Sequence, residues 1–233
     1  MIKAVLFDMD GTLLPMDQDV FTQAYFGALC KALAPRFEPK TLMRGVWNGI
    51  DAMLNNDGSR TDESEFWRAF REFTGRDGTE DAPYFDAFYE NDFDALKAAC
   101  GFDRKASETV RKLKADGYRL ALATNPVFPM LAQQKRLAWA GLDPNDFELI
   151  TSYENSSFCK PNVGYYKRIA EKLGLGPAEC LMAGNDVDDD MPAREIGMRV
   201  YLLTNCLINK SGKDIDVPHG DFDGLIEYIK SID

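Results

Sequence analysis

The chain has 233 residues, of which 45% are hydrophobic and 12% aromatic, so it can bury one sizeable core and a smaller second one. Its formal net charge of −11 argues against a protein that binds nucleic acid through a basic surface, and we expect no nucleic-acid partner. No apolar run approaches the ~20 residues of a membrane-spanning helix, so we expect no membrane span. We also expect no signal peptide, because its pattern is missing from the N-terminus.

Cysteine and histidine usage argues against two further kinds of site. The five cysteines are widely spaced and form no CxxC pair, which favours reduced thiols and a cytoplasmic location over a disulfide framework. The only histidine, His219, lies in the stretch DVPHGDF, where we expect an exposed loop. We therefore expect no catalytic triad or metal site built on histidine.

The predicted elements alternate between strands and helices, apart from one long interruption. The first strand, residues 2–7, is a short continuous apolar run, and residues 16–100 then show helical periodicity with few strand signals. Further strands are predicted at 118–124, 147–153, 179–184 and 199–203. Helices are predicted from Ser107, as N-cap, to about 116, and at 129–142, 162–174, 191–197 and 222–232.

This order of elements predicts an α/β fold. Residues 1–15 and 101–233 would form a three-layer, Rossmann-like core, in which a parallel sheet is covered by helices on both faces. Residues 16–100 would form an inserted α-helical cap domain, in which Phe66, Phe70 and Phe73 share one helical face.

Four groups of polar residues follow predicted strands of the core. In chain order these groups are Asp8 with Asp10, Thr124 with Asn125, Lys160, and the acidic run from Asp186 to Asp190. Ligands of open parallel sheets bind beyond the carboxyl ends of the strands. We therefore expect all four groups to meet in one site.

The acidic residues of this set indicate a cation site. Side chains two apart in an extended loop point the same way, so Asp8 and Asp10 can share one cavity if a cation relieves their repulsion. Asp186 and Asp190 could add oxygen ligands, and Lys160 could add a positive charge. A ligand set made of oxygen atoms favours Mg²⁺, which commonly shares its coordination shell with phosphate.

Hydrogen-bond donors complete the expected site. Thr12, Thr124 and Asn125 could donate to phosphate oxygens, together with backbone N–H groups around Gly11. The expected partner is therefore a small phosphorylated metabolite, bound beside Mg²⁺.

These motifs resemble those of a known superfamily. DMDGT, a threonine after a strand, the lysine of CKPNVGYY and the acidic stretch GNDVDDD occur in the order of the four motifs of the haloacid dehalogenase-like hydrolases. The resemblance covers residues 1–14 and about 104–233. The helical segment between the first two motifs is similar to the α-helical cap of that superfamily's phosphoglycolate phosphatase and β-phosphoglucomutase type.

The resemblance implies a role for each matching residue. Asp8 would be the nucleophile that forms an aspartyl-phosphate, and Asp10 would act as acid and then as base. Mg²⁺ would be held by an Asp8 oxygen, the Asp10 backbone carbonyl and Asp186, with Asp190 supporting the ion indirectly. The phosphoryl group would be bound by Thr124 and Lys160.

The fourth motif departs from the family pattern. Asn185 stands between Gly184 and Asp186, where the family commonly has glycine followed directly by aspartate. We place the metal ligand at Asp186, because Asp190 then follows four residues later. Asn185 or Asp189 could still replace one of these two acids.

The cap offers candidates for substrate contact. In the stretch LMRGVWNG, Arg44, Trp47 and Asn48 are the polar or amphipathic residues that we expect to face the substrate. Most other aromatic residues of the cap are expected to form its core.

Together these features predict a Mg²⁺-dependent phosphomonoester hydrolase. The presence of Asp10 disfavours a haloacid dehalogenase or a phosphonatase, because neither needs this second acid. A phosphomutase of the same superfamily would use the same core residues and is an alternative. A non-catalytic protein that binds phosphorylated ligands on this fold is another. The sequence carries no signal for an oligomeric state.

Overall fold

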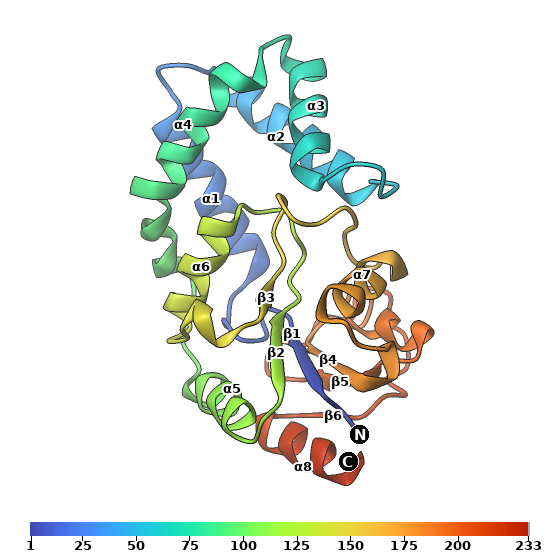
Figure 1. Ribbon diagram of the computed structural model, residues 1–233. Coiled ribbons are helices and arrows are strands. Elements are labelled where there is room, and N and C mark those ends of the chain that lie inside the picture. Colours follow the sequence, from blue (N-terminus) through green and yellow to red (C-terminus); the bar gives the residue numbers. More distant parts are fainter. Residues whose placement is uncertain (233) are drawn as a thin grey trace.

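The computed structural model describes residues 1–232, which are built around a sheet of six parallel strands (Figure 1). The spatial order is β3-β2-β1-β4-β5-β6, so the winding of the sheet reverses between β1 and β4. The strands are β1 (Ala4–Phe7), β2 (Arg119–Leu122), β3 (Leu149–Ile150), β4 (Cys180–Gly184), β5 (Arg199–Leu203) and β6 (His219–Gly220). The expected α/β fold with a parallel sheet is confirmed.

Helices cover both faces of this sheet. The core helices are α5 (Arg104–Ala115), α6 (Met130–Trp139), α7 (Val163–Leu173) and α8 (Phe222–Ile232). Val5 and Phe7 of β1 pack in the cluster that contains residues of α5, α6 and α8, whereas Ala4 and Leu6 pack in the cluster that contains α7. Successive side chains of a strand point to opposite faces, and both faces of the sheet are covered here. Every position of β1 is therefore buried and apolar.

The described part of the core also contains three short 3₁₀ helices, one of which lies where a helix was expected. They are η2 (Pro144–Asp146), η3 (Pro177–Glu179) and η4 (Met191–Ile196). The helix expected at 191–197 is therefore present over Met191–Ile196, but with the tighter 3₁₀ geometry.

The start of α5 corrects one expectation. Asp103 caps the helix by accepting a hydrogen bond from the backbone N–H of Lys105, and the helix begins at Arg104. The predicted N-cap, Ser107, lies inside the helix, where its hydroxyl donates to the Arg104 carbonyl at 3.0 Å. An aspartate four residues earlier was thus the better cap.

The two edge strands differ from the prediction. One is shorter than expected, and the other was not predicted. The strand expected at 147–153 is reduced to Leu149–Ile150, because the Tyr153 backbone N–H turns away from the sheet to the Phe128 carbonyl. His219 was expected in a loop but belongs to the two-residue strand β6, which pairs with β5. Its side chain is exposed, as expected.

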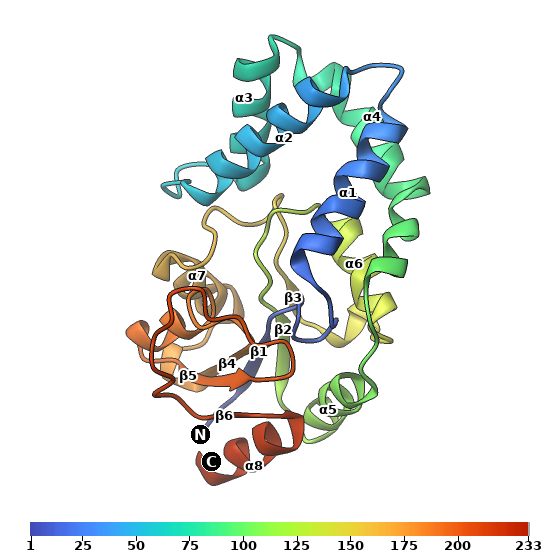
Figure 2. The same ribbon diagram turned by 180° about the vertical axis from the view of Figure 1, so that it is seen from behind.

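Between β1 and α5 every named element of the described chain is a helix, and we call these helices the cap. They are α1 (Gln18–Ala32), α2 (Pro39–Leu54), α3 (Asp62–Thr74), α4 (Gly78–Asn91) and the 3₁₀ helix η1 (Phe93–Ala99). Figures 1 and 2 show α1 to α4 at the end of the molecule opposite the two termini. Among residues 1–232, neither these helices nor the core helices include one long and apolar enough to cross a membrane.

Two glycines allow α2 and α3 to pack closely. A Cβ atom at Gly49 would lie 2.3 Å from the ring of Phe66, and one at Gly45 would lie 2.8 Å from the ring of Phe70. The absence of side chains on this face of α2 therefore brings the two helices together, with the aromatic rings of α3 filling the space.

Two neighbouring chain segments connect the cap to the core. Met16 and Cys100 form an antiparallel bridge, and the Gly101 backbone N–H donates to the Pro15 carbonyl at 2.7 Å. The chain therefore leaves the core and returns to it at adjacent points.

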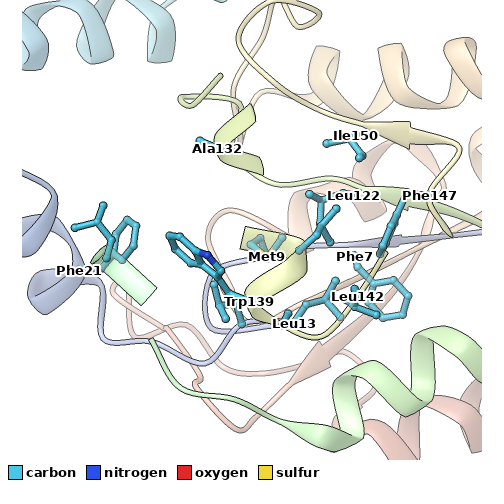
Figure 3. Close-up of a cluster of buried hydrophobic side chains, with 14 of the residues drawn as sticks. Phe7, Met9, Leu13, Phe21, Leu122, Ala132, Trp139, Leu142, Phe147 and Ile150 are labelled. Atoms are coloured by element: carbon cyan, nitrogen blue, oxygen red, sulfur yellow. The ribbon is translucent and has the colours of Figure 1, made fainter. Parts of the chain in front are cut away.

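A continuous apolar cluster also joins the cap to the core (Figure 3). Phe21 of α1 belongs to the same cluster as Trp139 of α6, Met9 of the loop after β1, and Phe7 and Leu122 of the sheet. The cap thus shares its hydrophobic core with the layer formed by α6.

A buried acid lies at a second contact between the cap and the core. Asp62 begins α3, and its backbone N–H donates to the Ser156 carbonyl of the core at 2.8 Å. Its carboxylate accepts a hydrogen bond from Asn56 at 2.7 Å and lies 3.9 Å from Cys159 Sγ. Burial raises the pKa of Asp62 to about 6.

Replacement of Asp62 by asparagine should stabilise the protein above pH 6. Because the pKa of Asp62 rises from 3.8 to about 6 on folding, the folded state binds this proton more tightly than the unfolded chain. Stability therefore falls as the pH rises between these values and stays lower above them. Asparagine keeps an oxygen acceptor for Asn56 without the charge, so we expect a gain of roughly 1–3 kcal/mol at pH 8 that disappears near pH 4.

Thermal and urea denaturation at both pH values measure this effect. Asp57→Asn is the matched control, because Asp57 lies in the loop just before α3 and is exposed, and it should give no gain at pH 8. A loss of stability in Asp62→Asn at pH 8, or the same change at both pH values, would contradict the assignment.

Candidate active site

The candidate site lies where the central strands end. The Asp8 backbone N–H donates to the Ala183 carbonyl at 3.0 Å, and the Ala123 N–H donates to the Phe7 carbonyl at 2.7 Å. The end of β1 is therefore fixed between the ends of β2 and β4. This is the reversal point of the winding, where open parallel sheets bind their ligands.

The polar groups that follow the strands line a hollow of about 180 Å³. Its lining residues, which define what we call the acidic hollow, are Asp8, Asp10, Gln18, Thr124, Asn125, Lys160, Asn185, Asp186, Asp189 and Asp190. The structure thus brings together all the core residues expected at the site except Thr12.

Lys160 connects two of the carboxylates. Its Nζ lies 2.8 Å from Asp8 Oδ1 and 2.6 Å from Asp190 Oδ1, and the residue is only 3% exposed. Burial acts to lower the pKa of Lys160, but the charges of Asp190 and Asp8 outweigh it and raise the pKa. A protonated lysine therefore holds Asp8 in place.

The loop after β2 positions this lysine. Asn125 Oδ1 accepts a hydrogen bond from the Lys160 backbone N–H at 3.1 Å. The Thr124 carbonyl accepts hydrogen bonds from the hydroxyls of Tyr165 at 2.7 Å and Thr151 at 2.8 Å. The backbone beneath the Thr124 side chain is therefore held from two sides.

Asn185 links the first and fourth motifs. Its Oδ1 accepts a hydrogen bond from the Thr12 hydroxyl at 2.7 Å, and its Nδ2 donates to the Cys206 carbonyl at 2.6 Å. The expected contact of the Thr12 hydroxyl with phosphate is therefore replaced by a contact with Asn185. Gly11, at φ +79°, must be glycine, since a Cβ there would lie 2.4 Å from Asn185 Nδ2.

The acidic loop after β4 is folded around Asp190. A Cβ at Gly184 would lie 2.1 Å from Asp190 Oδ2, so only glycine fits at this position. The same Oδ2 accepts a hydrogen bond from the Asp186 N–H at 3.0 Å. Asp186 Oδ1 in turn accepts from the N–H groups of Asp188 and Asp189 at 2.8 and 3.1 Å.

Asp10 forms an ion pair with an arginine that the sequence analysis did not select. Arg136 of α6 is completely buried, and its guanidinium pairs with the Asp10 carboxylate. The same group donates to Gln133 Oε1 at 2.9 Å and lies 5.0 Å from the centre of the Phe128 ring. Burial lowers the pKa of Arg136 to about 10, so the guanidinium stays protonated at neutral pH.

The acidic hollow has the chemistry of a divalent-cation site. Burial raises the pKa of Asp189, and the charges of Asp186 and Asp8 raise it further. Burial also raises the pKa of Asp190; Lys160 opposes this rise, and the charge of Asp8 adds to it. In residues 1–232, no three side chains of histidine, cysteine, aspartate or glutamate converge closely enough to hold a metal by themselves. The carboxylate and amide oxygens that line the hollow fit Mg²⁺, which binds few carboxylates and completes its shell with water and phosphate.

A second hollow, of about 200 Å³, lies between the cap and the core and also contacts Asp10. We call it the aromatic cavity, after the rings of Phe21, Tyr25, Phe26, Trp47, Phe66, Trp67, Phe85, Tyr89, Phe128 and Tyr153 that line it. Asp10 and Gln18 line both hollows, so the two are neighbours.

Only one of the three cap residues expected to face the substrate lines a hollow at the site. Trp47 forms part of the aromatic cavity. Arg44 and Asn48 are exposed and line neither hollow, and Asn48 Nδ2 donates to the Arg44 carbonyl at 2.7 Å.

Gln18 and Arg136 were missed by the sequence analysis. Gln18 is the first residue of α1 and has no distinguishing pattern around it. For Arg136 a signal existed, since it lies one turn from the buried Ala132 and next to the buried Leu137. A charge on the apolar side of a predicted helix indicates a buried partner.

Comparison with known proteins places the chain in a family. The model of the haloacid dehalogenase-like hydrolases matches residues 2–197. The glyceraldehyde 3-phosphate phosphatase of Methanothermobacter thermautotrophicus is 27% identical over 227 residues, which are 93% of this chain and 95% of the relative. The phosphoglycolate phosphatase of Nitrosospira multiformis is 26% identical over 219 residues, which are 87% and 83% of the two chains.

Solved structures share the fold along the whole chain. A protein from Haemophilus somnus, described as a predicted phosphoglycolate phosphatase, has a TM-score of 0.58 and 21% identity and covers 98% of both chains. The 2-haloacid dehalogenase of Pseudomonas syringae pv. tomato has a TM-score of 0.65 and 19% identity and covers both chains fully. The expected enzyme class, a hydrolase of the phosphatase type, is confirmed by the relatives' names. As its motifs indicated, the chain belongs to the haloacid dehalogenase-like hydrolase family.

Proposed function

We propose that this enzyme is a Mg²⁺-dependent phosphomonoesterase that acts on a small phosphorylated metabolite through an aspartyl-phosphate on Asp8. The observation that carries the proposal is the position of Asp8, held by the buried Lys160 at the edge of the acidic hollow with Asp10 lining the same space. The phosphatase names of relatives that match most of the chain support it.

The first half of the reaction transfers the phosphoryl group to the protein. An Asp8 carboxylate oxygen attacks phosphorus, and the bond between phosphorus and the ester oxygen breaks. Lys160, Thr124 and Asn125 bind the phosphoryl oxygens. Asp10 gives a proton to the departing ester oxygen, which leaves as an alcohol.

The second half returns the enzyme to its starting state. Asp10, now ionised, takes a proton from a water molecule that attacks phosphorus. The bond between phosphorus and the Asp8 oxygen then breaks and releases inorganic phosphate. Mg²⁺, held by Asp8, the Asp10 carbonyl and Asp186 with indirect support from Asp190, would neutralise charge on the transferring group.

Arg136 acts in this scheme as a positioning residue for Asp10. Its buried guanidinium pairs with the Asp10 carboxylate and is itself held by Gln133. The guanidinium can donate to an oxygen of Asp10 in both its protonated and its ionised form, so this contact would fix the orientation of Asp10 toward the ester oxygen in both halves of the reaction.

The helices of residues 16–100 would serve as a cap domain over this chemistry, with residues 1–15 and 101–233 as the catalytic core. The aromatic cavity between the two parts places apolar side chains beside Asp10. Closure of the cap over a bound ester would exclude water from the site.

Loss of the Asp8 nucleophile should abolish turnover. We expect Asp8→Asn to lower phosphate release from a panel of phosphorylated metabolites by roughly three orders of magnitude or more, and chelation of Mg²⁺ to stop release by the unaltered enzyme. The control is Asp223→Asn, because Asp223 is an exposed acid of α8 that pairs with Lys105. Full turnover by Asp8→Asn would refute the mechanism. Transfer of phosphate between substrate and product without net release would instead identify a phosphomutase.

Removal of the Arg136 charge should affect esters unequally. With Arg136→Met we expect kcat to fall roughly tenfold or more on an alkyl phosphate, whose leaving oxygen needs a proton from Asp10. The fall should be much smaller on p-nitrophenyl phosphate, whose leaving group needs no proton. Steady-state kinetics on both esters, with Arg136→Lys as the conservative variant, measure the difference. Equal losses on the two esters would show that Arg136 has only a structural role.

A further inference from the structure

The aromatic cavity occupies the place of the leaving group. In the proposed reaction the phosphoryl group lies in the acidic hollow and the ester oxygen lies at Asp10. Because Asp10 and Gln18 line both hollows, the part of the substrate beyond the ester oxygen extends into the aromatic cavity. The chemistry of this cavity therefore selects the alcohol that the enzyme releases.

The cavity has the size of one aromatic ring or a short branched chain. Its volume is about 200 Å³. An engineered apolar cavity of roughly 150 Å³ binds benzene, so a ring with one linking carbon atom fits here. Val46 and Ile50 of α2 add aliphatic surface to the aromatic walls.

No cation lines this cavity within the described part of the chain, where the lining includes neither lysine, arginine nor histidine. Arg136 lies nearby, 5.8 Å from the centre of the Phe21 ring, but its charge is paired with Asp10. The hydroxyls of Tyr25 and Tyr89 bond to each other at 2.9 Å. A carboxylate on the leaving group would thus lose its water without gaining a positively charged partner.

The surroundings of the cavity are acidic. Burial raises the pKa of Tyr153, which lines the cavity, and the charges of Glu63, Glu154 and Asp86 raise it further. These three carboxylates would repel an anionic group placed beside Tyr153. Both the walls and their surroundings therefore disfavour negative charge beyond the ester oxygen.

We propose that the substrates are phosphomonoesters of uncharged, apolar alcohols about the size of a single aromatic ring. This inference rests on the proposed phosphatase activity and names the substrate class of the same site. It separates the enzyme from a phosphatase for phosphoglycolate, whose leaving group carries a carboxylate. The aromatic walls bind the apolar group, and the acidic hollow binds the phosphoryl group.

Matched esters test the inference. We expect kcat/KM for 4-methylbenzyl phosphate to exceed that for 4-carboxybenzyl phosphate by about tenfold or more, since even one methylene group in an apolar pocket changes it roughly 10- to 200-fold. Benzyl phosphate should exceed 2-phosphoglycolate by a similar factor. Equal or greater kcat/KM for the two carboxylate esters would overturn the inference and leave the phosphatase activity established.

A cation placed in the cavity should reverse the preference. Thr22 lines the cavity from α1 and is partly exposed, so it tolerates a longer side chain. We expect Thr22→Lys to raise kcat/KM for 4-carboxybenzyl phosphate relative to 4-methylbenzyl phosphate by about tenfold. Thr22→Met, of similar length without the charge, should leave the ratio near that of the unaltered enzyme. An unchanged ratio in Thr22→Lys would contradict the placement of the leaving group.

A binding experiment tests this inference independently of the proposed phosphatase activity. If no ester releases phosphate, the phosphatase proposal fails, and isothermal titration calorimetry with Asp8→Asn still tests the cavity. Tighter binding of 4-methylbenzyl phosphate than of 4-carboxybenzyl phosphate would support the inference. Equal binding, or tighter binding of the carboxylate ester, would overturn it.

Discussion

The buried ammonium group of Lys160, between Asp8 and Asp190, is the interaction on which the rest of the site depends. It joins the loop after β3 to the ends of β1 and β4. Without this positive charge, two carboxylates would face each other in a space almost closed to water, which is strongly unfavourable. Asp190 also fixes the acidic loop, because its Oδ2 accepts a hydrogen bond from the Asp186 backbone N–H. The same oxygen lies so close to position 184 that only glycine fits there.

Two hollows of opposite character meet at Asp10. On one side lie carboxylates, a lysine and amide groups, which suit a phosphoryl group and a divalent cation. On the other side lie aromatic rings and aliphatic side chains from the cap and the core. A phosphomonoester has the same division between its anionic group and its leaving group, and in the proposed reaction Asp10 would lie at the oxygen that joins them. Arg136 pairs with Asp10 and holds this acid in place. Arg136 belongs to α6, the helix whose apolar side chains share one cluster with those of the cap.

The sheet and the central residues could be predicted because they depend on local patterns and on topology. The stretch AVLF is apolar at every position since both faces of β1 are covered, and the polar groups meet because parallel strands end at one edge. Asp8 and Lys160 are 152 residues apart and still lie 2.8 Å from each other. The partners of Thr12 and Arg136 could not be predicted, because they depend on how loops and helices pack in three dimensions. The same holds for the aromatic cavity, which needs four cap helices and the core to close it.

The most direct test of this account is to locate the phosphoryl group on the enzyme. The enzyme would be mixed with p-nitrophenyl phosphate, quenched rapidly in acid, reduced with borohydride and analysed by peptide mass spectrometry. If Asp8 is the nucleophile, homoserine forms at position 8 from the phosphorylated Asp8, while Asp10 remains unmodified. Phosphate release without any modified Asp8, or modification at Asp10 instead, would contradict the proposed mechanism.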